Sequence, residues 1–191
     1  MNNDKTIKIM IDNYFHELVV INSTLEIFLS MKFNKDWTKI SLISPTYFTL
    51  VRKSLLDDIV VSLSRLFEKS SRSDFNINKF CHTLRKSFNA NSKVLNLIDD
   101  YEKYLTGLAI INNLLIWRDK AIAHIDKEYF GDANSLGQDA PLNIDDLKGL
   151  ISTTFKFLND IYYDFNHEIQ TQLYYEYDDY KKLIYLVEKS K

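Results

Sequence analysis

The sequence is poor in the residues that interrupt or cross-link a chain. Its 191 residues include four glycines, two prolines and a single cysteine, Cys81. A β-sandwich or β-barrel needs many tight turns, so this scarcity of glycine and proline favours long uninterrupted helices. One cysteine cannot form a disulfide within the chain, which is typical of a protein in a reducing compartment.

Long apolar runs and a secretion signal are also missing. The most apolar stretch, residues 108–117, is interrupted by Asn112 and Asn113 and is too short to span a bilayer. The first residues are polar, and no apolar segment with a small-residue cleavage site follows them. We therefore expect a cytoplasmic protein without a membrane partner.

The charge balance excludes a strongly basic binder of polyanions, because the formal net charge is −2. The charge is unevenly distributed, however: residues 65–93 include seven basic residues and only two acidic ones. The basic residues are Arg65, Lys69, Arg72, Lys79, Arg85, Lys86 and Lys93. They could form a local phosphate-binding patch or a solvated helical surface, and the sequence leaves both interpretations open.

Helical periodicity dominates the rest of the chain. Through residues 5–31, apolar side chains recur alternately four and three positions apart, in a heptad seam. The seam consists of Ile7, Ile11, Tyr14, Leu18, Ile21, Leu25 and Phe28. It predicts lengthwise packing against another helix, either of the same protomer or of a second one. The same periodicity predicts further helices at about 45–69, 77–88, 93–125 and 144–188.

These patterns predict an all-α fold, a bundle of five or six helices that forms one domain over residues 1–191. The motif-bearing core is expected at about 45–127 and a C-terminal helical region at about 143–188, with a break near 168–172. Polar residues at 34–44 and an exposed loop at 129–142 are expected to connect helices.

The helix at 45–69 is apolar around so much of its circumference that it should be central. Asp57, Asp58 and Arg65 stand out on it, because an unpaired charge in the interior is costly. We expect Asp58 and Arg65 either to form a buried structural pair or to support a nearby site.

No metal or cofactor site is indicated. The four histidines lie far apart, and none stands at a metal-ligand spacing from a cysteine or a second histidine. The sequence has no glycine-rich phosphate loop and no G-x-S-x-G nucleophile elbow.

One short string does combine groups suited to chemistry. Arg118 and His124 stand at the end of the helix predicted over 93–125, and Asp119 could orient either of them. Arginine stays cationic and binds phosphate oxygens through a planar fork, and histidine titrates near neutral pH. In an ideal helix the two lie about 120° and about 9 Å apart. Arginine's reach, a distorted turn or a second protomer must therefore bring such groups together. The alternative is a capping cluster near a helix C-terminus.

The nine residues 118–126, Arg-Asp-Lys-Ala-Ile-Ala-His-Ile-Asp, resemble the Arg-polar-x-His signature of the HEPN superfamily (higher eukaryotes and prokaryotes nucleotide-binding). The full string looks like that of the AbiU-like, abortive-infection branch. Residues 63–68, Leu-Ser-Arg-Leu-Phe-Glu, are similar to a second feature of that branch, with Glu68 in place of an expected aspartate. The resemblance covers roughly residues 45–127.

The resemblance implies a metal-independent endoribonuclease, commonly a homodimer, that acts as a toxin or antiphage effector. Arg118, His124 and Asp119 would be its catalytic residues, RNA its substrate, and a cognate antitoxin a further partner. RNA carries its own nucleophile, the 2′-hydroxyl, so cleavage needs proton transfer and charge stabilisation. A dimer that apposes two motifs would supply two histidines. The alternative is a non-catalytic HEPN module that binds RNA, nucleotide or a protein partner.

Overall fold

The computed structural model describes residues 2–69, 75–88, 93–123 and 133–166, together with Tyr185 and Lys189. All secondary structure in these ranges is helical, and they contain no strand. The elements are α1 (Asn2–Phe33), α2 (Lys35–Ser41), α3 (Pro45–Phe67), α4 (Ile77–Ser87), α5 (Lys93–Thr106), α6 (Ala109–Trp117), the π-helical turn η1 (Arg118–Ala123), α8 (Ala133–Asp139) and α9 (Ile144–Asn166). The predicted all-α fold is confirmed.

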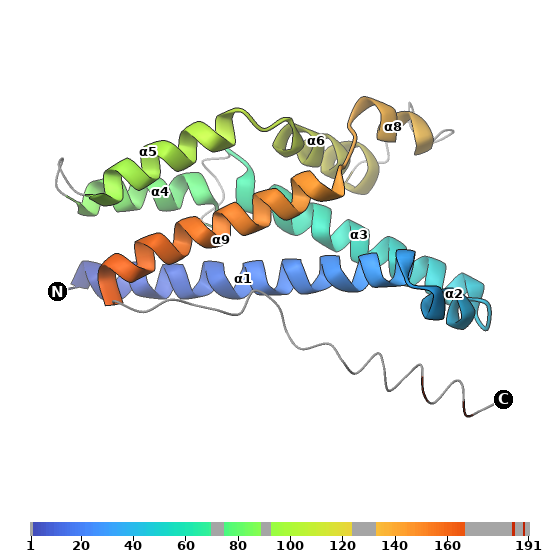
Figure 1. Cartoon of the computed structure of the whole chain (residues 1–191). Coiled ribbons are helices and arrows are strands. Elements are labelled where there is room, and N and C mark those ends of the chain that lie inside the picture. The colour runs from blue at the N-terminus through green and yellow to red at the C-terminus, as the bar shows by residue number, and fades with distance from the viewer. Residues whose placement is uncertain are drawn as a thin grey trace.

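Helix α1 is the longest described helix, and α2, α3, α4 and α9 all contact it. Helices α3 and α9 pack on it; α4, α5 and α6 lie above α9 in the view of Figure 1, and α4 also contacts α1 and α3. A single large core takes side chains from α1, α3, α4, α5, α6 and α9. Among the described residues, none of the helices combines the length and apolar character needed to cross a membrane.

The heptad seam of α1 is used inside the protomer. Its first six members are each at most 1% exposed, in a helix that packs on α3, α9 and α4. Of the two packing partners that the sequence allowed, the structure therefore shows the one within the same chain. Burying a large aliphatic side chain stabilises a fold by about 1.5–3 kcal/mol, so this seam is a major part of the core.

Two short helices occupy segments that the sequence predicted as connections. Helix α2 begins where the Asn34 side chain accepts a hydrogen bond from the Asp36 amide at 2.8 Å. It buries Trp37 and Ile40 in a small cluster of their own. Helix α8 buries Leu136, so the exposed loop predicted over 129–142 is wrong for residues 133–139. A helix of seven residues carries too little periodicity to be recognised.

The single helix predicted over 93–125 is also wrong. Helix α5 ends at Thr106, the amides of Gly107 and Leu108 close tight turns onto Tyr104 and Leu105, and α6 begins at Ala109. Leu108 has an extended backbone, with φ −94° and ψ 107°. The apolar stripe continues across the break, which is why the pattern did not show it. This break, with α2 and α8, raises the described helices above the expected five or six.

The remaining predicted helices are confirmed where the structure describes them. Helix α3 matches the expectation at 45–69, α4 matches 77–88, and α9 matches the first half of 144–188. The expected break near 168–172 lies outside the described residues.

Candidate functional site

The segment that carries the sequence motif is not an ordinary helix. At the end of α6 the amide of Arg118 is shared between the carbonyls of Leu114 and Leu115, and the chain continues as the π-helical turn η1. A π-helical turn holds an extra residue compared with an α-helical one, and such turns are frequent at functional sites. The distorted turn, one of the three possibilities that the sequence left open, is therefore present immediately before His124.

Two neighbouring segments fix α6 in place. The buried hydroxyl of Ser64 on α3 donates a hydrogen bond to the Leu114 carbonyl at 3.0 Å. The indole Nε1 of Trp117 donates to the Ala140 carbonyl at 2.6 Å, and the Asn113 amide donates to the Pro141 carbonyl at 2.9 Å. Helix α6 is thus held between α3 and the start of the segment leading into α9.

The side chain of Arg118 lies between two carboxylates. Its Nη1 is 2.8 Å from Oε2 of Glu68, and its Nε is 2.8 Å from Oδ1 of Asp119. Glu68 follows the last residue of α3 with an extended backbone, and its amide donates to the Ser64 carbonyl. The two hydrogen-bonded carboxylates raise the pKa of Arg118 above its ordinary value, Asp119 having the larger effect. The guanidinium therefore stays fully charged.

The two carboxylates that bind Arg118 differ in their exposure to solvent. The Glu68 side chain is 20% exposed and the Asp119 side chain 54% exposed, with Arg118 between them at 27%. Two negative charges on one cation leave the cluster formally at −1. Of the two carboxylates, the more exposed Asp119 is the one that can turn into solvent.

A family model for HEPN_AbiU2, described as AbiU2, matches residues 4–183. The chain belongs to this AbiU2 family of HEPN domains. The resemblance carried by residues 118–126 is confirmed, and the bundle is an all-α, HEPN-like fold. The family places this AbiU2 chain among abortive-infection-related HEPN modules. Comparisons with curated proteins and with solved structures give no significant match.

His124, the residue that the motif pairs with Arg118, lies outside the described residues. The described part of η1 ends at Ala123, directly before it. The approach of the His124 imidazole to the Arg118 guanidinium therefore stays a prediction, as does the dimer that would bring in a second histidine.

The buried pair expected of Asp58 and Arg65 is not formed. Asp58 is exposed, and Arg65, 51% exposed, forms an ion pair with Glu17 of α1. Asp57 pairs with Lys53 on the same helix. These charges lie on the edges of α3 that α1 and α6 leave uncovered, so none requires a partner in the interior. A supporting role for Asp58 and Arg65 in catalysis stays a prediction.

Glu68 is the site residue that sequence reasoning missed. In the sequence, Glu68 was recognised only as part of the family-like string at 63–68, and no role was assigned to it. The structure places its carboxylate on Arg118, a residue fifty positions later in the chain. That string was the only signal in the sequence, because a contact between α3 and η1 depends on how the helices pack.

Three of the seven basic residues at 65–93 form ion pairs with acidic neighbours in the part of the chain that the structure describes. Arg85 contacts both Asp99 and Glu102 at 2.6 Å, and Lys93 contacts Asp164 of α9 at 3.3 Å. Together with the pairing of Arg65, these contacts favour the solvated-surface interpretation for the described members. Lys69 is exposed at the end of α3, close to Glu68 in the chain.

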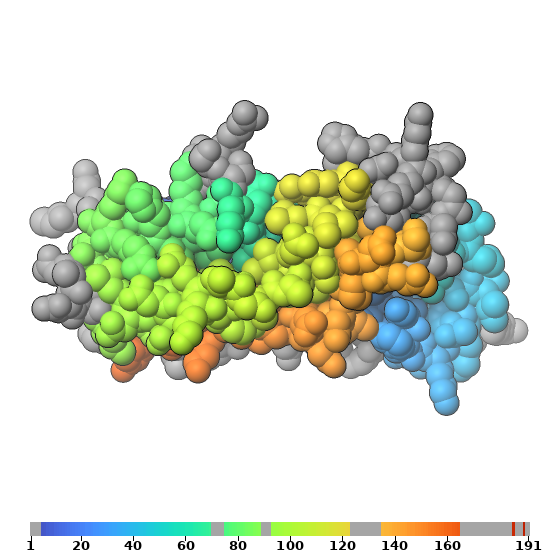
Figure 2. All heavy atoms as spheres, turned by 90° about the horizontal axis from the view of Figure 1, so that it is seen from above, coloured from blue at the N-terminus to red at the C-terminus, as the bar shows by residue number. Residues whose placement is uncertain are grey.

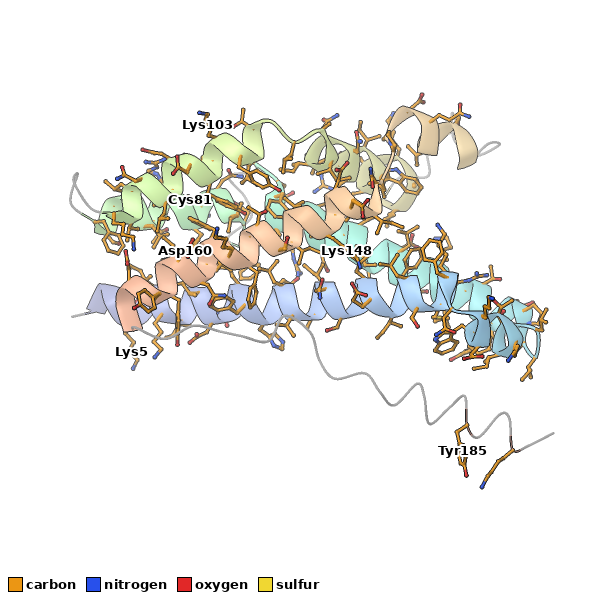
Figure 3. All side chains as sticks on the ribbon, viewed as in Figure 1. Lys5, Cys81, Lys103, Lys148, Asp160 and Tyr185 are labelled. Carbon is orange, nitrogen blue, oxygen red and sulfur yellow. The ribbon has the colours of Figure 1, made fainter. Side chains whose placement is uncertain are left out.

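Cys81 is not suited to act as a nucleophile in this AbiU2 protein. It lies on α4 in the interior, 1% exposed (Figure 3). Burial, with a smaller effect of the Glu102 charge, raises the pKa of its thiol to about 12. A cysteine attacks as its thiolate, and Cys81 holds its proton at neutral pH. Among the described residues, no three His, Cys, Asp or Glu side chains gather closely enough to hold a metal ion.

Proposed function

We propose that this AbiU2 protein is a metal-independent endoribonuclease that acts as a toxin or antiphage effector in abortive infection. One observation carries the proposal. A cationic Arg118, held by Glu68 and Asp119, stands at the start of a π-helical turn that ends directly before His124. Membership of the AbiU2 family supports the biological setting.

The proposed reaction is attack of the 2′-hydroxyl of RNA on the adjacent phosphorus. The bond between O2′ and phosphorus forms and the bond to O5′ breaks, leaving a 2′,3′-cyclic phosphate and a 5′-hydroxyl. One proton leaves O2′ and one reaches O5′, so the net reaction needs a group that both accepts and donates protons. Histidine is suited to this near neutral pH, and we assign the transfer to His124. Apposed protomers would let one histidine act as base and the other as acid.

Arg118 binds the non-bridging phosphate oxygens, whose charge grows in the transition state. Charge-assisted hydrogen bonds from a guanidinium to such oxygens are strong and directional. The phosphate replaces the exposed Asp119 carboxylate at Nε, while Glu68 keeps its bond to Nη1. Asp119 acts at one remove, by holding the guanidinium in place before the phosphate binds.

The deciding experiment is RNA cleavage by the wild type, by His124→Ala and by Arg118→Ala, each with and without EDTA. General acid–base catalysis contributes about 10²–10⁴-fold, so His124→Ala should lower cleavage at least about 100-fold. Arg118→Ala should do likewise, and Arg118→Lys should rescue little because the planar fork is lost. RNA with a 2′-deoxy group at the scissile nucleotide should resist. Loss of activity with EDTA, or full activity of His124→Ala, would overturn the mechanism.

The alternative function is a non-catalytic module that binds RNA, nucleotide or a protein partner. Within this alternative the arrangement around Arg118 favours a protein partner, because Glu68 and Asp119 more than offset the arginine charge. Under this alternative the wild type binds RNA without cutting it, and His124→Ala binds equally well.

We also propose that a cognate antitoxin binds this AbiU2 protein near Arg118 or modifies a residue there. A toxin must be restrained in its host cell, and the Arg118 side chain is accessible to a partner. Co-expression with the neighbouring gene product should relieve toxicity. Full toxicity that is unaffected by any neighbour would contradict the proposal.

A further inference from the structure

A cleft of about 510 Å³ lies next to Glu68. It opens where the end of α3 meets α4 and the bend between α5 and α6. Figure 2 shows this end of α3, in teal, at the surface between the green of α4 and α5 and the yellow of α6. The volume is in the range of small-ligand sites in proteins, about 300–1,000 Å³.

The walls of the cleft are mainly aliphatic. They include Leu105, Leu108, Ile111 and Leu115, all half-buried, with the buried Phe67 behind them. The helix break at Gly107–Leu108 creates this shape, because α5 and α6 turn apart there. A continuous helix would have packed the same side chains along one straight stripe.

A few polar groups stand among these walls. Asn78 is half-buried and Asn112 exposed, and each amide carries both a donor and an acceptor. Lys69 brings a positive charge and has no ion-pair partner among the described residues. Glu102 also borders the cleft, but its carboxylate is bound by Arg85.

Glu68 connects the cleft to the arginine. Its backbone carbonyl accepts a hydrogen bond from the Asn78 amide at 3.3 Å, and its carboxylate binds Arg118 at 2.8 Å. Leu115, in the cleft wall, lies one turn before Arg118. The cleft and the Arg118 guanidinium therefore lie on two sides of Glu68. A nucleotide could place its base in the cleft and its phosphate on the guanidinium.

We propose that this cleft binds a nucleobase of single-stranded RNA, next to the phosphate that Arg118 holds. The inference rests on the proposed function and names the form of its substrate. A base has flat apolar faces for the aliphatic walls and a polar edge for the asparagine amides, which pair with base edges elsewhere. Lys69 would contact the adjoining backbone phosphate. An aliphatic protein side chain would fill the walls but would cover the Asn112 amide without offering it a partner, which is costly.

The test is a titration of the full chain with each of the four ribonucleoside 3′-monophosphates, followed by NMR. These probes cannot be cleaved, so the readout is independent of catalysis. The side-chain amide signals of Asn78 and Asn112 and the methyl signals of Leu105 and Leu108 should move with at least one nucleotide.

Asn112→Ala should weaken that binding at least about fivefold, in line with the loss of an amide–base pair. Its side chain is exposed, so the fold should survive. The matched control is Asn96→Ala, an exposed asparagine at the other end of α5, which should bind as the wild type does. A second variant, Thr106→Trp, should block the mouth of the cleft, and circular dichroism would verify its fold.

The outcomes separate this inference from the proposed function. Unmoved cleft signals, or equal binding by Asn112→Ala and Asn96→Ala, would overturn the base site even where Arg118→Ala abolishes cleavage. Movement of the same signals by a leucine-rich peptide instead of nucleotides would make the cleft a protein-docking surface and likewise overturn it. Nucleotide binding in the cleft without any RNA cleavage would support the base site and contradict the endoribonuclease.

Discussion

Arg118 has two carboxylate partners that differ in their contact with solvent. Exposed ion pairs contribute about 0–1 kcal/mol, because water and salt screen them. The Asp119 pair, with its carboxylate more than half exposed, belongs to this class. The Glu68 pair is more shielded and is fixed at its backbone by the bond to Ser64. At the scale of single residues, Glu68 therefore determines where the guanidinium points.

Glu68→Ala should lower kcat about 100-fold, the loss expected when a catalytic group is misplaced by about 1 Å. KM should change much less, because Arg118 can still contact phosphate from altered positions. Glu68→Asp should recover part of the activity. The matched control is Glu26→Ala, which breaks a similarly shielded ion pair with Lys148 away from the site. Steady-state cleavage kinetics give both constants, and an unchanged kcat for Glu68→Ala would remove the positioning role.

Asp119→Asn should reduce cleavage less than Arg118→Ala does. The asparagine oxygen can still accept from Nε, and in the proposed mechanism the exposed carboxylate acts only through Arg118. Cleavage rates of the two variants under identical conditions check this. A loss for Asp119→Asn as large as that for Arg118→Ala would show that Asp119 acts on the substrate directly.

At the scale of the elements, the contact between α3 and α6 places the π-helical turn. Ser64 is buried on α3 and bonds to the Leu114 carbonyl, four residues before Arg118. The backbone amide of Arg118 is shared between that carbonyl and the carbonyl of Leu115. The hydroxyl of Ser64 thus supplies a partner where the regular helical hydrogen bonding is disturbed.

Ser64→Ala should destabilise the fold by about 1 kcal/mol, the usual net contribution of one hydrogen bond. Urea denaturation would measure the change in the free energy of unfolding. Ser54→Ala on the exposed side of the same helix is the control, and should be neutral or slightly stabilising because alanine favours helices. Equal effects of the two substitutions would show that the bond to Leu114 contributes nothing.

At the scale of the whole molecule, the core contains protonated groups that resist ionisation. Burial raises the pKa of the Cys81 thiol to about 12 from an ordinary 9.0, and raises the pKa values of Tyr14 and Tyr101 as well. Tyr101 shares a hydrogen bond with Thr154 of α9 at 2.7 Å, so ionisation there would disrupt the contact between α5 and α9.

Stability should therefore be lost at alkaline pH. The unfolded chain releases the Cys81 proton from about pH 9 and the folded chain only near 12, so the free energy of unfolding should fall between these values. Below pH 9 this contribution is fully present. Urea midpoints at pH 7, 9 and 10.5 test the prediction, and Cys81→Val should flatten the pH dependence. An equally steep fall in that variant would rule out the thiol as its source.

The homodimer is the second prediction at this scale. Light scattering at micromolar concentration should give twice the mass of one chain. The apolar seam of α1 is buried within the protomer, so it cannot form the contact between two protomers. A group of exposed apolar side chains lies at the ends of α1 and α2 and the start of α3, and it is the candidate dimer surface. Its members are Phe33, Leu42, Ile43, Tyr47 and Leu50. A monomer, or a dimer with its motifs on opposite faces, would contradict the prediction.

The sequence by itself determined the fold class and most helices of this AbiU2 protein. The seam from Ile7 to Leu25, the proline at the start of α3 and the stripe of α9 are local patterns, and local patterns specify local structure. It also determined the motif, because Arg118, Asp119 and His124 are neighbours in the chain. The bend at Gly107–Leu108 left no such mark, since the apolar stripe runs through it.

Only the tertiary structure decided what surrounds Arg118. Periodicity shows that a helix has an apolar face, but it does not show which helix covers that face or how far the cover extends. For that reason Asp58 and Arg65 were expected inside and lie outside, and Glu68 was overlooked although it binds Arg118. The meeting of the end of α3 with η1 depends on the packing of α1, α3 and α6 together, because contacts between distant residues are fixed by the shapes of whole faces.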